Sequence, residues 1–100
     1  MKFKIPEPRE NIIVLIRKLG YIPKENIRGE FNCMRYLGGR DYPKFHLFLK
    51  REENDQLSFS LHLDQKIPSY KGTRAHSGEY EGELVEKEVE RIKKIVEESK

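Results

Sequence analysis

Two stretches in the middle of the chain alternate regularly between apolar and polar residues. The apolar members of residues 42–51 and 56–65 are Phe45, Leu47, Leu49, Leu57, Phe59, Leu61 and Leu63. A period of two over this length is typical of antiparallel strands with one buried face. The polar segment 52–55 between the two stretches predicts a turn, so we expect the strands to form a hairpin.

The spacing of apolar residues changes to that of helices toward both ends of the chain. In residues 8–19 the apolar residues recur on one helical face, and Gly20 stands where a helix end favours a left-handed residue. In residues 81–98 Val85, Val89 and Ile92 recur at intervals of four and three, with Val96 one turn further on. The pattern therefore predicts two amphipathic helices.

A weaker alternation over residues 30–37 predicts a third strand. The first eight residues are interrupted by two prolines and are expected to be extended, residues 24–29 to be a polar connection, and residues 67–78 to be a long loop. The resulting α-β-β-β-α order predicts an α+β fold. We expect a two-layer sandwich in which a three-stranded antiparallel sheet buries one face under the two helices.

Composition limits the chain to one small domain. Its 100 residues are 36% hydrophobic and 37% charged, which leaves room for a single thin core over residues 1–100. The longest apolar run, residues 12–16, is too short to cross a bilayer, so no membrane partner is expected. Cys33 is the only cysteine, which rules out an internal disulfide and favours the reducing cytoplasm.

The formal net charge of +3 is unevenly distributed. Residues 1–78 carry 15 Lys/Arg against 9 Asp/Glu, a balance of +6, whereas residues 79–100 carry 5 against 8, a balance of −3. A basic body favours an anionic partner, and we expect that partner to be RNA.

Polar side chains of the hairpin are expected on the sheet face that the helices leave open. They are Lys44, His46, Phe48, Lys50, Ser58, Ser60, His62 and Asp64. Pairing inward residues with inward residues allows a register that sets His46 opposite His62, or one that sets His46 opposite Ser60. Both registers place the two imidazoles on one face as direct or diagonal neighbours, with Asp64 two residues beyond His62.

The segment before the last helix combines cations, hydroxyls and glycines, a composition that holds anions. Together with the open sheet face it predicts an RNA-binding surface that needs no cofactor. The candidate contact residues are Lys44, Phe48, Lys50, Lys66, Lys71, Arg74 and His76.

Three other interpretations of these residues stay open. His46, His62 and His76 are candidate catalytic residues of a small ribonuclease that uses one imidazole as base and another as acid, with Lys44 or Lys66 stabilising the developing charge. His46, His62 and Asp64 are candidate metal ligands, although their spacing matches no recognised metal motif. Alternatively, the histidines are solvated residues of the sheet face, and Phe48 belongs to a protein interface or a homodimer.

The element order resembles that of the double-stranded-RNA-binding-domain fold. The segment Ile16-Arg17-Lys18-Leu19-Gly20-Tyr21 after the first helix is similar to the start of HicA-type mRNA-interferase toxins, which have that fold and cleave RNA with a histidine. The family's histidine follows a glycine near the first strand, whereas Gly29-Glu30-Phe31-Asn32 contains none. The resemblance therefore implies RNA and the fold, and assigns no catalytic residue.

Overall fold

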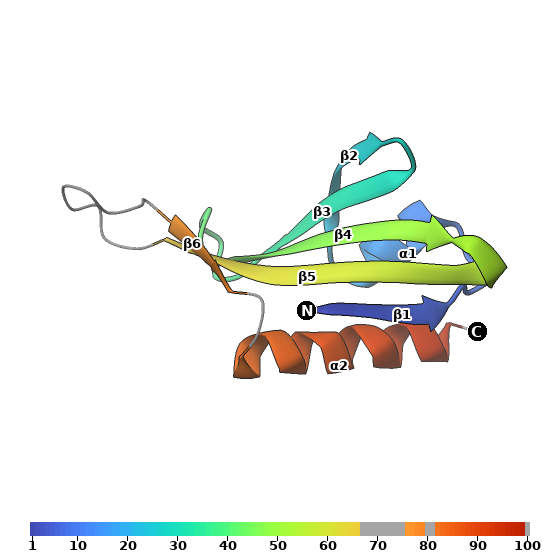
Figure 1. Cartoon of the computed structure of the whole chain (residues 1–100). Coiled ribbons are helices and arrows are strands. Elements are labelled where there is room, and N and C mark those ends of the chain that lie inside the picture. Colours follow the sequence, from blue (N-terminus) through green and yellow to red (C-terminus); the bar gives the residue numbers. More distant parts are fainter. Residues whose placement is uncertain (67–75, 80–81, 100) are drawn as a thin grey trace.

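A computed structural model of the chain describes residues 1–66, 76–79 and 82–99 (Figure 1), with the backbone alone for residue 66 and residues 76–79. The elements are β1 (Lys2–Pro6), α1 (Ile12–Lys18), β2 (Ile22–Ile27), β3 (Glu30–Tyr36), β4 (Lys44–Glu52), a 3-10 turn η1 (Glu53–Asp55), β5 (Gln56–Lys66), β6 (His76–Glu79) and α2 (Glu83–Glu98).

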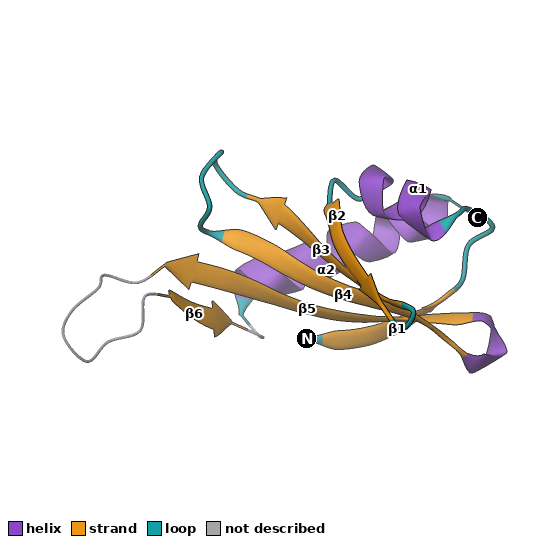
Figure 2. Cartoon of the chain, turned by 90° about the horizontal axis from the view of Figure 1, so that it is seen from above, coloured by secondary structure: helices purple, strands orange, loops and turns teal. Residues whose placement is uncertain are grey.

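The strands form one antiparallel sheet in the order β1-β5-β4-β3-β2 (Figure 2). The sixth strand, β6, also pairs with β5. Since β4 occupies one edge of β5, β1 and β6 follow each other along the opposite edge, β1 beside residues 56–60 and β6 beside residues 63–66. The expectation of a three-stranded sheet is therefore wrong, whereas the two-layer α+β class agrees with the structure.

The three unexpected strands have weak sequence signals for physical reasons. Strand β1 is short and ends at a proline, but it packs inward through Phe3, whose ring stacks on Phe59 at 4.8 Å between centroids. Strand β2 is an edge strand that contains Pro23 and leaves most of its side chains exposed, so residues 24–27 have no apolar alternation. Strand β6 covers residues 76–78 of the expected loop, and residues 67–75 lie outside the described residues.

Helix α1 is shorter than expected at its start and ends as expected. Asn11 caps it by accepting a hydrogen bond from the Ile13 backbone N–H at 2.8 Å, so the helix begins at Ile12 and not at residue 8. Gly20 has φ +88°, and the Tyr21 and Gly20 N–H groups donate to the carbonyls of Ile16 and Arg17, both at 3.0 Å. This pair of bonds is the Schellman arrangement that the glycine predicts.

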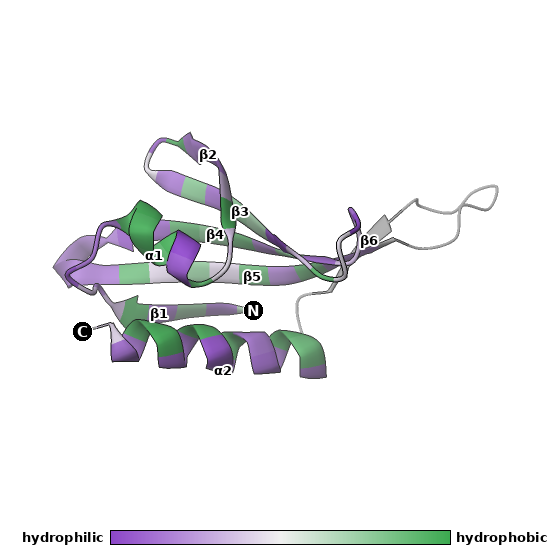
Figure 3. Cartoon of the chain, turned by 180° about the vertical axis from the view of Figure 1, so that it is seen from behind, coloured by the Kyte–Doolittle hydropathy of each residue, from purple (hydrophilic) through white to green (hydrophobic). Residues whose placement is uncertain are grey.

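The hairpin of β4 and β5 adopts the register that pairs His46 with His62 and Leu49 with Phe59. Pairing extends to Glu52 and Gln56, so the first strand runs one position beyond its predicted end, and only the three residues of η1 form the turn. Hydrophobic and hydrophilic residues alternate along β3 and β5 (Figure 3). One face of the hairpin is thus apolar, and the other carries its polar residues.

The apolar face of the sheet packs against both helices, and α2 runs along the sheet (Figure 1). Leu47, Leu49 and Leu61 of the hairpin are fully buried against Leu15 of α1 and Ile92 of α2 in one core cluster. Each such side chain stabilises the fold by roughly 1.5–3 kcal/mol. Both helices lie on this face, so no helix of the described residues covers the opposite face, called the outer face below.

Cys33 of β3 belongs to the core. It is buried, and its thiol donates to the Leu47 carbonyl at 3.3 Å. Burial raises the pKa of the thiol to about 12. A thiol held in its neutral form is a poor nucleophile.

A charged cluster lies at the edge of this core. Glu88 of α2 is 4% exposed and accepts hydrogen bonds from the Tyr21 hydroxyl at 2.5 Å, from Arg35 of β3 at 3.2 Å and from Arg91 at 2.7 and 2.9 Å. Arg91 also donates to the Leu19 carbonyl at 2.6 Å. These four side chains, called the Glu88 cluster below, join α2 to β3 and to the end of α1.

No helix in the described part of the chain is long and apolar enough to cross a membrane.

Candidate functional site

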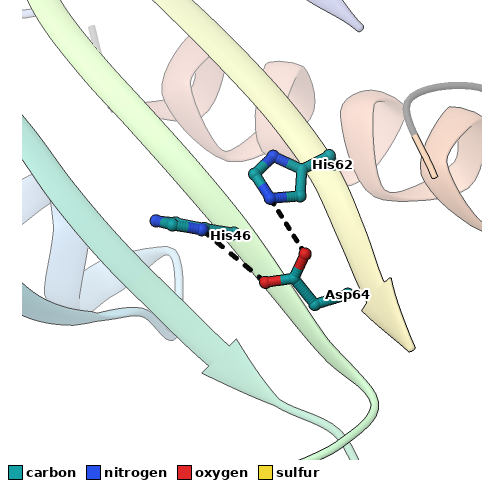
Figure 4. Close-up of side chains that lie close together, drawn as sticks. All are labelled: His46, His62 and Asp64. Atoms are coloured by element: carbon teal, nitrogen blue, oxygen red, sulfur yellow. Dashed lines mark ion pairs between the residues drawn. The ribbon is translucent and has the colours of Figure 1, made fainter. Parts of the chain in front are cut away.

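The outer face brings two histidines into direct contact (Figure 4). His46 of β4 and His62 of β5 are cross-strand partners, and their ring centroids lie 4.7 Å apart with the planes inclined by 54°. The alternation of each strand points both imidazoles away from the core, and the register sets them opposite each other. The predicted direct pair is therefore present.

Asp64 completes this group, called the His–Asp cluster below. One carboxylate oxygen, Oδ1, lies 3.0 Å from Nε2 of His62, and the other, Oδ2, lies 3.7 Å from Nδ1 of His46 (Figure 4). The three side chains are 12–15% exposed, so they are mostly covered yet accessible from one side. The cluster thus sits in a protected position on the outer face.

Asn32 of β3 contacts Nε2 of His46, the ring nitrogen that does not face Asp64. With its amide in this orientation, Oδ1 of Asn32 accepts a hydrogen bond from Nε2 of His46, which assigns the ring proton to Nε2. Nδ1 of a neutral His46 then turns a lone pair toward Asp64, whose oxygen is also an acceptor. At 3.7 Å no hydrogen bond joins these two atoms. Two acceptors therefore face each other at the centre of the cluster.

Burial lowers the pKa of both histidines. For His46 the neighbouring His62 and Lys44 lower the pKa further, while Asp64 raises it. For His62 the effect of burial also exceeds that of Asp64, which raises the pKa by charge and by its hydrogen bond. Both imidazoles are therefore neutral near neutral pH, which is the state in which their nitrogens bind metals or accept protons.

Phe48 connects the His–Asp cluster to a groove on the same face. The centroid of its ring lies 4.5 Å from the ring centroid of His46 and 6.2 Å from that of His62. Beyond Phe48 the groove has a volume of about 440 Å³. The residues that line this lysine groove are Lys2, Phe3, Lys4, Glu30, Phe48, Lys50, Glu52, Ser58, Phe59 and Ser60.

Lys44 lies at the other end of the cluster. It is the cross-strand partner of Asp64, but its ammonium group lies over the rings of Tyr42 and Tyr36, at 4.4 and 5.7 Å from their centroids. In the described part of the chain Lys44 forms no ion pair. The outer face therefore offers a cation and two aromatic rings beside the cluster.

The structure brings together some of the predicted site residues and leaves others undescribed. His46, His62, Asp64 and Phe48 form one group, and Lys50 lies in the groove next to it. The backbones of Lys66 and His76 pair between β5 and β6, but their side chains lie outside the described structure, as do Lys71 and Arg74 entirely.

Sequence reasoning missed Asn32, Lys2 and Lys4. Asn32 precedes His46 by 14 positions and reaches it only through the pairing of β3 with β4. Lys2 and Lys4 alternate with Phe3 and Ile5, which is a strand signal, but five residues that end at a proline do not identify a partner strand.

A scan of protein-family models and searches of curated proteins and of solved structures each returned no match. The candidate site therefore rests on its own geometry.

Proposed function

We propose that the outer face binds single-stranded RNA, with the strand lying in the lysine groove and a base stacking on Phe48. The observation that carries this proposal is the groove itself, which combines three lysines, two serine hydroxyls and an aromatic ring on an open sheet. Aromatic and basic side chains on an exposed sheet are the elements with which single strands are bound without base pairing.

The charge of the groove favours an anionic chain. Lys2, Lys4 and Lys50 are exposed and form no ion pair among the described residues. Glu30 and Glu52 also line the groove, so its three lysines and two glutamates leave a formal balance of +1. The lysines remain available to neutralise phosphates, and the counterions released from the strand supply binding energy.

Residues 67–78 belong to this proposal through their composition alone, with Lys71, Arg74 and His76 as further phosphate contacts. We also propose the reducing cytoplasm as the compartment, because the single cysteine is held in the core as a thiol.

Fluorescence anisotropy with a labelled RNA of about eight nucleotides tests the proposal. Exchanging both Lys2 and Lys4 for Glu is expected to weaken binding at least tenfold and to flatten its dependence on salt concentration. The matched control exchanges Lys87 and Lys94, which are exposed on α2, for Glu and is expected to bind as the parent does. Equal losses in the two double variants, or binding that ignores salt, would refute the groove as the RNA site.

The contribution of stacking has its own variant. Phe48→Leu keeps an apolar side chain but removes the ring, and it is expected to weaken RNA binding about tenfold, equivalent to about 1.4 kcal/mol and within the usual range for one stacked base. The salt dependence should stay that of the parent, because no phosphate contact is lost. An unchanged affinity would show that no base stacks there.

The ribonuclease alternative has less direct support. In His46, Nε2 is hydrogen-bonded to Asn32 and Nδ1 faces Asp64, so both ring nitrogens have a protein neighbour. RNA incubated with the parent and with a variant in which His46 and His62 are both Ala separates the two functions. Cleavage by the parent alone would favour the enzyme.

A second copy of this chain is the competing occupant of the outer face. Sedimentation of the protein at high concentration distinguishes it, because a dimer through this face would dissociate when Phe48 is exchanged for a charged residue. A monomer at all concentrations would remove that alternative.

A further inference from the structure

We propose that the His–Asp cluster is a binding site for a divalent transition-metal ion, Zn²⁺ before others, with Nδ1 of His46, Nε2 of His62 and a carboxylate oxygen of Asp64 as ligands. The proposal goes beyond RNA binding, because its ligand atoms belong to none of the residues that line the lysine groove. It rests on the geometry of the cluster and on the orientation that Asn32 imposes on His46.

The ligand atoms are already close to the spacing that a tetrahedral ion requires. One ligand atom from each of the three residues lies within 4.8 Å of the other two. Bonds of about 2.0–2.1 Å to zinc place neighbouring tetrahedral ligands about 3.3 Å apart. Oδ1 of Asp64 lies 3.0 Å from Nε2 of His62, and the other oxygen, Oδ2, lies 3.7 Å from Nδ1 of His46. Each imidazole nitrogen is therefore close to the required distance from one of the two carboxylate oxygens.

The donor set suits the same ions. Two imidazole nitrogens and one carboxylate oxygen are ligands of zinc and of other first-row metals, whereas calcium and magnesium prefer oxygen alone. Three protein ligands leave a fourth position for water or another ligand. The cluster and the lysine groove lie on the same outer face, with Phe48 between them.

The electrostatics of the same contact give a second reason. Nδ1 of His46 and Oδ2 of Asp64 approach without a donor between them, an arrangement that a cation resolves. Asn32 acts as the positioning residue, because a partner for the remote ring nitrogen fixes the tautomer of a metal-binding histidine. His62 donates its Nε2 proton to Asp64 in the present arrangement and would carry it on Nδ1 with metal bound. That exchange leaves the ring neutral.

Titration of the chelator-treated protein with Zn²⁺ by calorimetry, and with Co²⁺ by visible absorption, tests the site. The parent is expected to bind one equivalent and to show the visible bands of four-coordinate Co²⁺. His46→Ala, His62→Ala and Asp64→Asn are each expected to weaken binding by at least about 100-fold, more than the loss of an outer partner. Circular dichroism confirms that each variant is folded.

Asp41→Asn is the matched control for Asp64→Asn, because Asp41 is an exposed carboxylate in the turn between β3 and β4. It is expected to bind zinc as tightly as the parent. No saturable binding by the parent, or equal binding by the two asparagine variants, would overturn the proposal.

Asn32 provides a test that a merely structural role would not satisfy. Asn32→Leu removes the acceptor and is expected to weaken zinc binding about 10–100-fold, and Asn32→Asp, which keeps an acceptor at the same place, should restore it. A cobalt spectrum and affinity that are the same in all three proteins would exclude the positioning role. These titrations contain no RNA, so their failure leaves the groove proposal standing, and failure of RNA binding leaves the metal site standing.

Discussion

The Glu88 cluster and the His–Asp cluster both place a carboxylate among nitrogen donors, but they are built differently. Glu88 receives hydrogen bonds at both oxygens from three side chains that carry hydrogens to donate. Asp64 receives a bond from His62 on one oxygen and faces an acceptor of His46 with the other. Both oxygens of Glu88 therefore accept hydrogen bonds from the protein, whereas only one oxygen of Asp64 does.

Under our proposal, this difference separates a structural role from a binding role. Every deeply buried side-chain nitrogen and oxygen among the described residues has a hydrogen-bond partner, and the Glu88 cluster follows this rule with charged groups. The His–Asp cluster opens to the outer face instead, where an added ligand can complete it. We therefore expect removal of Glu88 to harm stability, and removal of Asp64 to harm binding alone.

Glu88→Leu is expected to have the largest effect on folding. It leaves Arg35 and Arg91 without their shared carboxylate and the buried Tyr21 hydroxyl without an acceptor. Removing one partner of a buried pair costs about 3–5 kcal/mol, and the partial exposure of the arginines places the loss near about 3 kcal/mol. Urea unfolding measures it, and Glu90→Leu, an exposed site on the same helix, is the control with a change within about 0.5 kcal/mol.

Asp64→Asn is expected to have a smaller effect of opposite sign in chelator-treated protein. The asparagine oxygen still accepts from His62, and the amide NH₂ can donate to Nδ1 of His46, which resolves the contact between acceptors. We expect a gain in unfolding free energy of about 0.5–1 kcal/mol, one net hydrogen bond. A loss as large as that of Glu88→Leu would mean that Asp64 is structural and that the two clusters do not differ.

Mild acid is expected to produce the smallest change, through the two histidines. Their pKa values are lowered below the ordinary 6.5, so the unfolded chain binds protons before the folded chain does. Stability is therefore fully present above pH 6.5 and is lost as the pH falls through the lowered folded values. Unfolding of chelator-treated parent at about pH 7 and about pH 5 measures the loss. A variant in which both histidines are Phe should show a weaker dependence, and an equal one would assign the effect to other groups.

The hairpin at the centre of this site could be predicted because both of its strands alternate regularly between apolar and polar residues. Strands β4 and β5 alternate over nine and eleven residues, and parity alone restricted His46 to facing His62 directly or diagonally. The edge strands could not be predicted in the same way. Most side chains of strand β2 are exposed to solvent, so its sequence does not need to alternate between apolar and polar residues.

The Glu88 cluster was not predictable for a different reason. Glu88 lies among many charged residues of an amphipathic helix, and its partners Tyr21 and Arg35 are 67 and 53 residues away in the chain. Only the packing of α2 against the sheet distinguishes it from the solvated glutamates beside it. Asn32 shows the same limit at the His–Asp cluster, since a polar strand residue gives no sign of which neighbour it will contact.

The three candidate metal ligands all come from the β4–β5 hairpin, which has consequences for how the protein can change. Their relative placement depends on one turn and one register, and not on how β2 or α1 is attached. Insertions in the β2–β3 connection would alter the periphery while the ligands keep their spacing. The hairpin, together with Asn32 on the adjacent strand β3, is in this sense a transferable module, and a redesigned protein that preserves its register would inherit the site.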